Sequence, residues 1–178
     1  TYSFVDPEAE RQWMDLLMAW RDKASILGLW DYGYGITCFT LPKVFFHKQA
    51  SVLRKINEAG IQSGFVEGVP SFGEGPKRYL YLKLFDNVST DVDAALDDWC
   101  QAAVGKEAAP HLREYYDFWE KFWCERVVKT DWFKSSKMAT YTALVPDGGY
   151  MNAIEKGDIP KCRSLMEKVV ELAQRHGD

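Results

Sequence analysis

Ser25-Ile-Leu-Gly-Leu-Trp30 is a short apolar run in which apolar and polar residues do not alternate. Such a run is typical of a strand that is buried on both faces, and strands of that kind belong to parallel sheets. A second short strand is predicted over Ile61-Gln-Ser-Gly-Phe-Val66. Between the strands, Pro42 is expected to open a helix that runs to about Ala59, where Gly60 ends it. The sequence therefore predicts two parallel strands joined by a helix.

Another helix is predicted before the first strand. Asp6-Pro7-Glu8 supplies a capping acid, a proline at the first helical position and an acid in the first turn. Apolar residues then follow at spacings of three and four, which mark one helical face: Trp13, Leu16, Leu17, Trp20 and Ala24. Residues 1–75 thus alternate between helices and strands, which is typical of repeated βα units.

After Pro76 the pattern becomes helical. Helices are expected over residues 77–85, 90–105 with Thr90 as the cap, 108–128, and from Asp158 to Gly177. Two strands cannot close a barrel. We therefore expect an α/β, helix-rich chain, with the last βα units of a (β/α)8-type barrel in residues 1–88 and a helical extension in residues 89–178. Since the chain starts at Thr1 without a methionine, the upstream half of the same polypeptide is an expected partner.

Composition argues against several classes of function. The chain has 178 residues, of which 47% are apolar and 27% charged, enough for a packed core. Its net charge of −4, with no basic run, argues against nucleic acid as a partner. No apolar stretch is long enough to span a membrane. The cysteines and histidines form no local cluster, so buried thiols are expected, one disulfide remains open, and neither a metal nor a cofactor is predicted: Cys38, Cys100, Cys124, Cys162, His47, His111 and His176.

Aromatic residues make up 15% of the chain, which is compatible with a bulky core or with a sugar-binding surface. The helix predicted over residues 108–128 carries too many of them for one face: Tyr115, Tyr116, Trp119, Phe122 and Trp123. Some are therefore expected to pack outward, against another helix or against the upstream part of the chain.

Several short segments stand in a fixed order over residues 25–126. They are Leu29-Trp30-Asp31-Tyr32, Pro42, Gly60-Ile-Gln-Ser-Gly-Phe-Val-Glu-Gly68, Tyr79-Leu-Tyr-Leu-Lys-Leu-Phe85, Asp91-Val-Asp93, Trp99-Cys100, Gly105, Ala108-Ala-Pro110 and Tyr115-Tyr116. As a set they resemble a bacterial family of glycoside-hydrolase-like proteins that carry a domain of unknown function. The barrel of that family is of the same general kind as those of α-glucuronidases and β-hexosaminidases.

The chain departs from the family pattern at a few places. Phe85, Asn87 and Val104 stand where the family commonly has Trp, Pro and Tyr, and family members are several hundred residues long. The resemblance implies that the two strands are the last two of eight, with the chemistry at their C-terminal ends. It also implies a carbohydrate ligand and a secreted or periplasmic location.

Asp31 and Glu67 follow the two strands and are the candidate catalytic residues. Glycoside hydrolysis usually needs two carboxyl groups, about 5–5.5 Å apart for retention and about 6.5–9.5 Å apart for inversion. Neighbouring strands lie about 4.8 Å apart, so either spacing is possible. Alternatively, Asp31 makes a loop or helix-cap hydrogen bond, and Glu67 lines a polar cleft or reaches solvent. The general acid would then lie in the upstream half.

The candidate substrate-binding residues are Trp30, Tyr32, Tyr34 and Glu74. Aromatic faces beside carboxylates suit a sugar, although they suit a core equally well. Strand alternation adds a constraint: if Asp31 faces the cleft, Trp30 and Tyr32 point elsewhere unless the chain turns at once. Glu74 lies in a Gly-rich loop that lacks the lysine ending of a phosphate loop, so an active-site loop is the preferred interpretation.

The leading hypothesis is the C-terminal part of a glycoside-hydrolase-like protein that binds or hydrolyses carbohydrate. Hydrolysis of O-glycosyl bonds is expected only with the full barrel. Two alternatives stay open, a non-catalytic carbohydrate-binding module and a helical protein-interaction module. The leading hypothesis differs from the non-catalytic module in that Asp31 and Glu67 converge on one accessible cleft within about 10 Å. The helical module is favoured if both acids face solvent on separate surfaces and the aromatic residues of the helical extension form the main exposed patch.

Overall fold

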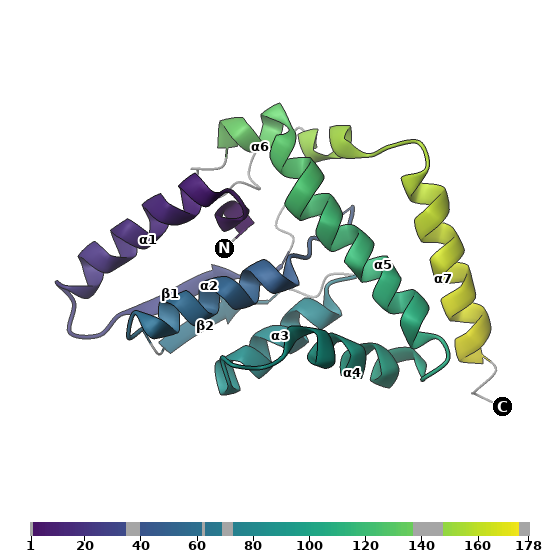
Figure 1. Cartoon of the computed structure of the whole chain (residues 1–178), viewed down its shortest axis with the longest axis horizontal. Helices are drawn as coiled ribbons and strands as arrows, with labels where there is room; N and C mark the ends of the chain where they lie inside the picture. Colours follow the sequence, from purple (N-terminus) through teal and green to yellow (C-terminus); the bar gives the residue numbers. More distant parts are fainter. Residues whose placement is uncertain (1, 35–39, 62, 69–72, 137–147, 175–178) are drawn as a thin grey trace.

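The computed structural model describes residues 2–34, 40–61, 63–68, 73–136 and 148–174 (Figure 1). The chain is helix-rich and contains a small parallel sheet. In chain order the helices and strands are α1 (Pro7–Arg21), β1 (Gly28–Tyr32), α2 (Phe46–Glu58), β2 (Ser63–Glu67), α3 (Gly75–Asp86), α4 (Val92–Val104), α5 (Ala109–Lys121), α6 (Asp131–Ser136) and α7 (Asp158–Gln174). The predicted order of strands and helices is confirmed.

Local capping explains where several helices begin. Asp6 accepts a hydrogen bond from the Ala9 amide at 2.9 Å and so caps α1, as predicted. For α4 the cap is Asp91, which accepts from the Ala94 amide at 3.0 Å, and the prediction of Thr90 is wrong by one residue. The Thr90 hydroxyl instead donates to main-chain carbonyl groups at the end of α3.

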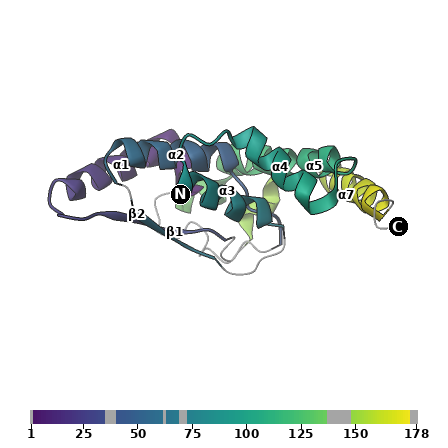
Figure 2. The same cartoon turned by 90° about the horizontal axis from the view of Figure 1, so that it is seen from below.

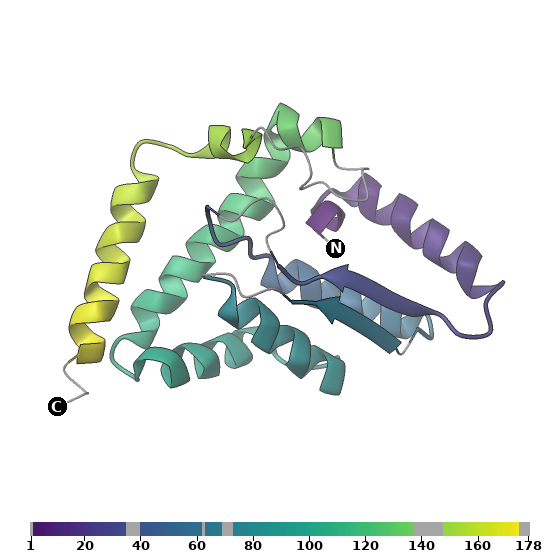
Figure 3. The ribbon, with the colours of Figure 1, turned by 180° about the vertical axis from the view of Figure 1, so that it is seen from behind.

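β1 and β2 pair in parallel, as expected, with Gly28 opposite Ser63 and Tyr32 opposite Glu67. Figure 2 shows the helices on one side of this sheet, and Figure 3 shows the strands in front of α2 with their other face towards the viewer. Leu29 packs against the apolar side chains of α2, whereas Trp30 is 65% exposed and Phe65 59% exposed. The prediction that the strands are buried on both faces is therefore wrong, because in the part of the chain that the structure describes helices cover only the face to which Leu29 points.

The aromatic residues of α5 and of the π-helical turn that follows it (Phe122–Arg126) form the centre of the core. Trp119, Phe122 and Trp123 are all at most 2% exposed. They do not form an outward patch, because α4 and α7 pack along α5 and the π-helical turn changes the direction of the side chains after Lys121. The Trp123 indole also donates to the Pro42 carbonyl at 2.5 Å, which ties this core to the segment between β1 and α2.

One hydrophobic core runs from Leu41 to Val169, across the predicted boundary at residue 88. That boundary falls in the turn between α3 and α4. Among the described residues, no helix combines the length and apolar character needed to cross a membrane.

A tertiary contact replaces the missing local cap of α2. Pro42 does not open this helix, and Phe45, which precedes it, has no capping side chain. The Glu120 carboxylate of α5 accepts a hydrogen bond from the His47 amide at 2.8 Å, and it lies 2.9 Å from the His47 ring Nδ1. His47 Nε2 lies 3.4 Å from Asp93 of α4. His47 thus joins α2 to both α4 and α5.

The contacts of the His47 ring with Glu120 and Asp93 predict that the stability of the fold depends on pH. The hydrogen bond to Glu120 raises the pKa of His47 and outweighs the opposing effect of burial. The protonated ring therefore stabilises the fold below about pH 6.5, the unfolded value, and the contribution is lost as the pH rises through the folded-state pKa. We expect His47→Gln to lower the free energy of unfolding more at acidic than at alkaline pH, by less than about 1 kcal/mol because the ring is half exposed.

Urea unfolding of the wild-type and variant chains at about pH 5.5 and about pH 9, on either side of the histidine pKa, measures this difference. Glu120→Gln is the matched variant: it keeps an acceptor for the His47 amide but removes the charge, so it should reduce the same pH dependence. An equal loss at both pH values would show that His47 contributes only through packing.

Candidate functional site

The strand register separates the predicted site residues into two sets. Asp31 pairs with Val66, and Tyr32 pairs with Glu67. Paired residues on neighbouring strands point to the same face, and successive residues along a strand point to opposite faces. Asp31 therefore points towards α3, whereas Glu67 points to the uncovered face. The two candidate catalytic acids are not brought together on one face of the sheet.

Asp31 is buried behind the sheet and is held by hydrogen bonds. It is 6% exposed, and it accepts from the Tyr81 hydroxyl of α3 at 2.5 Å and from the Tyr32 amide at 2.9 Å. Tyr81 is itself 2% exposed. These bonds give Asp31 a structural role, although neither is the loop or helix-cap hydrogen bond that was the expected alternative. A catalytic role for Asp31 stays a prediction.

Glu74 is also buried, in an ion pair that the sequence analysis missed. Its carboxylate lies 3.1 Å from Lys77 Nζ, and that ammonium group also donates to the Lys43 carbonyl at 2.8 Å. Burial lowers the pKa of Lys77 to about 8, and the Glu74 charge opposes that shift. The position of Glu74 gives no support to the predicted sugar contact, because its carboxylate lies below the surface and anchors the start of α3.

Lys77 could have been found from the sequence by its spacing. It precedes Leu80, Tyr81 and Leu84 by three, four and seven residues, which places it on the buried face of the helix. Lysine is rarely buried without a partner, so this spacing indicates an acid nearby. The sequence does not show that the partner is Glu74.

The uncovered side of the sheet carries the remaining candidates, and we call it the open face: Trp30, Tyr32, Tyr34, Phe65 and Glu67. Its ring centroids are 6.4 Å apart for Trp30 and Tyr32, 5.8 Å for Tyr32 and Tyr34, and 5.7 Å for Trp30 and Phe65. The Tyr34 hydroxyl donates to Glu67 Oε1 at 3.3 Å. Four aromatic rings and one carboxylate thus form a continuous group on this face.

The open face suits a ligand that has apolar C–H surface and hydroxyl donors. Aromatic faces pack against the apolar surface, and a carboxylate accepts hydrogen bonds at several positions. A catalytic role for Glu67 stays a prediction. Among the described residues no cluster of histidine, cysteine, aspartate or glutamate has the geometry of a metal site.

Two grooves in the described part of the chain lie away from the open face. One, of about 690 Å³, lies between α2 and α5 and includes His47, Arg113 and Glu120. The other, of about 580 Å³, lies beside the start of β2 and includes Ser63, Phe85 and Val88. Neither groove includes a residue of the open face.

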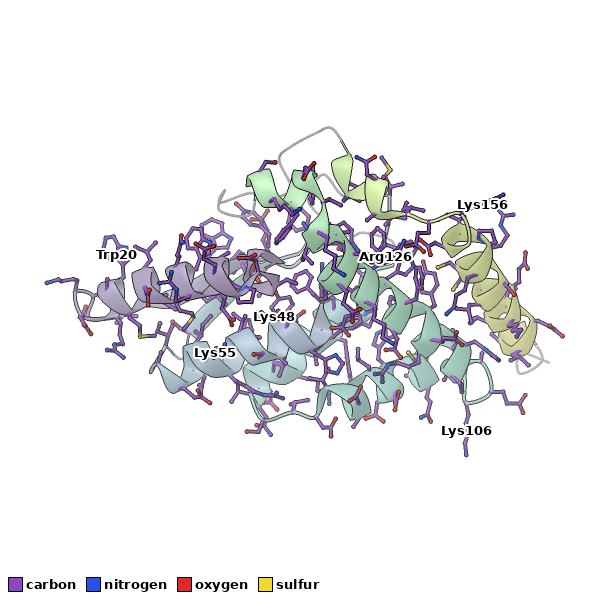
Figure 4. All side chains as sticks on the ribbon, turned by 45° about the horizontal axis from the view of Figure 1, so that its top comes forward. Trp20, Lys48, Lys55, Lys106, Arg126 and Lys156 are labelled. Atoms are coloured by element: carbon purple, nitrogen blue, oxygen red, sulfur yellow. The ribbon has the colours of Figure 1, made fainter. Side chains whose placement is uncertain are left out.

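The side of α2 next to α1 is occupied by ion pairs. Lys48 and Lys55 both contact the Glu10 carboxylate, at 2.8 and 2.7 Å (Figure 4). These contacts attach α1 to α2. Both cations share this one carboxylate.

Cys100 and Cys162 are buried free thiols, and Cys124 is a half-buried one. Burial raises the pKa of each, to about 11, 11 and 12 respectively, so they remain protonated at neutral pH. The expectation of buried thiols is confirmed for Cys100 and Cys162 and met in part for Cys124. Cys38 and His176 lie outside the described residues.

The hydrogen bond between Tyr81 and Asp31 is expected to make a measurable contribution to the free energy of unfolding. Tyr81→Phe removes a donor from a buried carboxylate, and we expect the free energy of unfolding to fall by about 1–3 kcal/mol. Tyr79→Phe, at a half-buried position of the same helix, is the matched control and should change it by less than about 0.5 kcal/mol. Urea unfolding measures both, and equal effects would contradict a structural role for this bond.

The geometry above lies within a segment that matches a known protein family. Residues 3–117, which run from before α1 into α5, match the family described as a domain of unknown function, DUF4838. Neither a curated protein nor a solved structure matches the chain. The match covers α1 to α4, both strands, and therefore Glu67 and the whole open face. Since it extends over more than half of its length, the chain belongs to the DUF4838 family.

Proposed function

We propose that the open face binds carbohydrate. The observation that carries this proposal is the grouping of four aromatic side chains with Glu67 on one uncovered sheet face. Trp30 and Phe65 leave more than half of their surface in water. An exposed group of large apolar side chains is unfavourable unless a ligand or another surface uses it. A pyranose ring offers both an apolar face for the rings and hydroxyl groups for the carboxylate.

We further propose that the strands and the helices beside them are the last βα units of a (β/α)8-type barrel. The parallel pairing of β1 and β2 supports this, because parallel sheets normally have both faces covered. In a barrel the open face would turn towards the interior, and Tyr32 and Glu67 would lie at the C-terminal ends of their strands, where barrel sites form. The helices from α4 onward would then be an addition to the barrel.

The chain alone is expected to bind a sugar without cleaving it. Glycoside hydrolysis usually needs two carboxyl groups. On the open face Glu67 is the acid that the described residues supply, because Asp31 lies behind the sheet. A second acid would have to come from additional strands, so Glu67 is proposed first as a binding residue.

The binding proposal is tested with Trp30→Ala. We expect the dissociation constant for soluble neutral oligosaccharides to rise about tenfold, because the variant removes the most exposed ring of the open face. Isothermal titration calorimetry on the chain measures this change.

Trp20→Ala is the matched control, because Trp20 is 59% exposed but belongs to α1 and not to the sheet (Figure 4). It should leave the dissociation constant unchanged. An equal loss in both variants, or no binding of any glycan by the wild-type chain, would refute the proposal.

One observation favours a second function, that of a protein-interaction module. α1 exposes Leu16 by 48% and Trp20 by 59%, and these residues lie four apart on one helical face. A partner helix could cover them. If the wild-type chain binds no glycan, this surface becomes the better candidate.

A further inference from the structure

We infer that the open face selects soluble oligosaccharides without negative charge and discriminates against uronic acids. This inference deepens the proposed carbohydrate binding and rests on it. It follows from the way the sheet distributes charge between its two faces, and from the angles between the aromatic rings.

The charge on the open face is negative. Glu67 lies there, and its Oε1 accepts the Tyr34 hydroxyl, which holds the carboxylate among the rings. A carboxylate has further acceptor positions that can receive hydroxyl groups of a neutral sugar. The carboxylate of a uronic acid brought to the same place would meet the like charge of Glu67.

The nearby lysines lie behind the sheet. Lys77 and Lys43 are 1% and 4% exposed, and the Lys77 ammonium group is bound to Glu74 and to a main-chain carbonyl. They are therefore not available to pair with an acidic sugar on the other face. Arg78 also lies near the end of β2, with its Cδ 3.9 Å from the position of a Cβ at Gly68. It belongs to α3, which covers the opposite face.

The ring angles limit the form of the ligand. Tyr32 and Tyr34 are inclined by 83°, and Trp30 and Phe65 by 87°. Trp30 and Tyr32 are inclined by 36°. Rings at such angles do not make the flat platform that a crystalline polysaccharide surface would need. They fit a single soluble chain that turns against successive rings.

The experiment compares a neutral galacto-oligosaccharide with an oligogalacturonide of the same length and linkage. Calorimetric titration of the chain at low and at high ionic strength gives both dissociation constants. We expect the oligogalacturonide to bind at least about fivefold more weakly at low salt, from like-charge repulsion at about 4 Å in water. High salt should bring the two dissociation constants closer together, since salt screens the repulsion between exposed charges.

Glu67→Gln is the decisive variant. It keeps an oxygen acceptor for the Tyr34 hydroxyl, so the face is preserved while the charge is removed, and circular dichroism checks that the fold is retained. We expect this variant to bind the two sugars with similar dissociation constants. Glu58→Gln, at an exposed position near the end of α2, removes the same charge elsewhere and should keep the discrimination of the wild-type chain.

Three results would overturn the inference, and they are distinguishable. Equal or tighter binding of the oligogalacturonide refutes the charge preference but leaves carbohydrate binding in place. If Arg78→Gln then abolishes that binding, Arg78 is the residue that recognises the acid. Discrimination that persists in Glu67→Gln shows that another group causes it. Binding of neither sugar refutes the proposed function itself.

Discussion

The parallel register of β1 and β2 is the constraint on which the candidate site depends. Because Tyr32 lies opposite Glu67, and Asp31 opposite Val66, the alternation of side chains sends the two acids to opposite faces. If either strand shifted by one residue in this pairing, its side chains on the open face would move to the face that the helices cover. The pairing that places Trp30 beside Phe65 therefore places Asp31 on the opposite face of the sheet.

The face of the sheet that α3 covers shows how the fold accommodates buried charge. Asp31 receives two hydrogen bonds there, and Glu74 and Lys77 neutralise each other below the surface. An unpaired charge at either place would be strongly destabilising, whereas a paired and hydrogen-bonded one is tolerated. All three side chains help to hold α3 against the strand ends, and so they fix the surface on which Glu67 is displayed.

The helical part of the chain is joined to the sheet by polar contacts as well as by the core. Trp123 bonds to the Pro42 carbonyl, and Glu120 caps α2 through the His47 amide. These contacts connect α5 to the segment between the two strands. The aromatic side chains of residues 115–123 are too many for one helical face, and they pack into the core on more than one side of the helix. This is possible because α4 and α7 both pack against α5 and a π-helical turn follows it. A division at residue 88 would therefore cut through one continuous core.

Local patterns in the sequence determined the positions of the strands, most helix starts and ends, and the placement of Glu67 at the end of a strand. These features depend on capping, periodicity and turn residues within a few positions of one another. Only the tertiary structure decided which face each acid occupies, that Glu74 is buried with Lys77, and that Glu120 caps α2. The physical reason is that most of these contacts join residues far apart in the chain, such as Asp31 with Tyr81 and His47 with Glu120. Glu74 and Lys77 are only three residues apart, but their burial depends on how α3 packs against the segment that contains Lys43. Their geometry depends on strand register and helix packing, which no local pattern encodes.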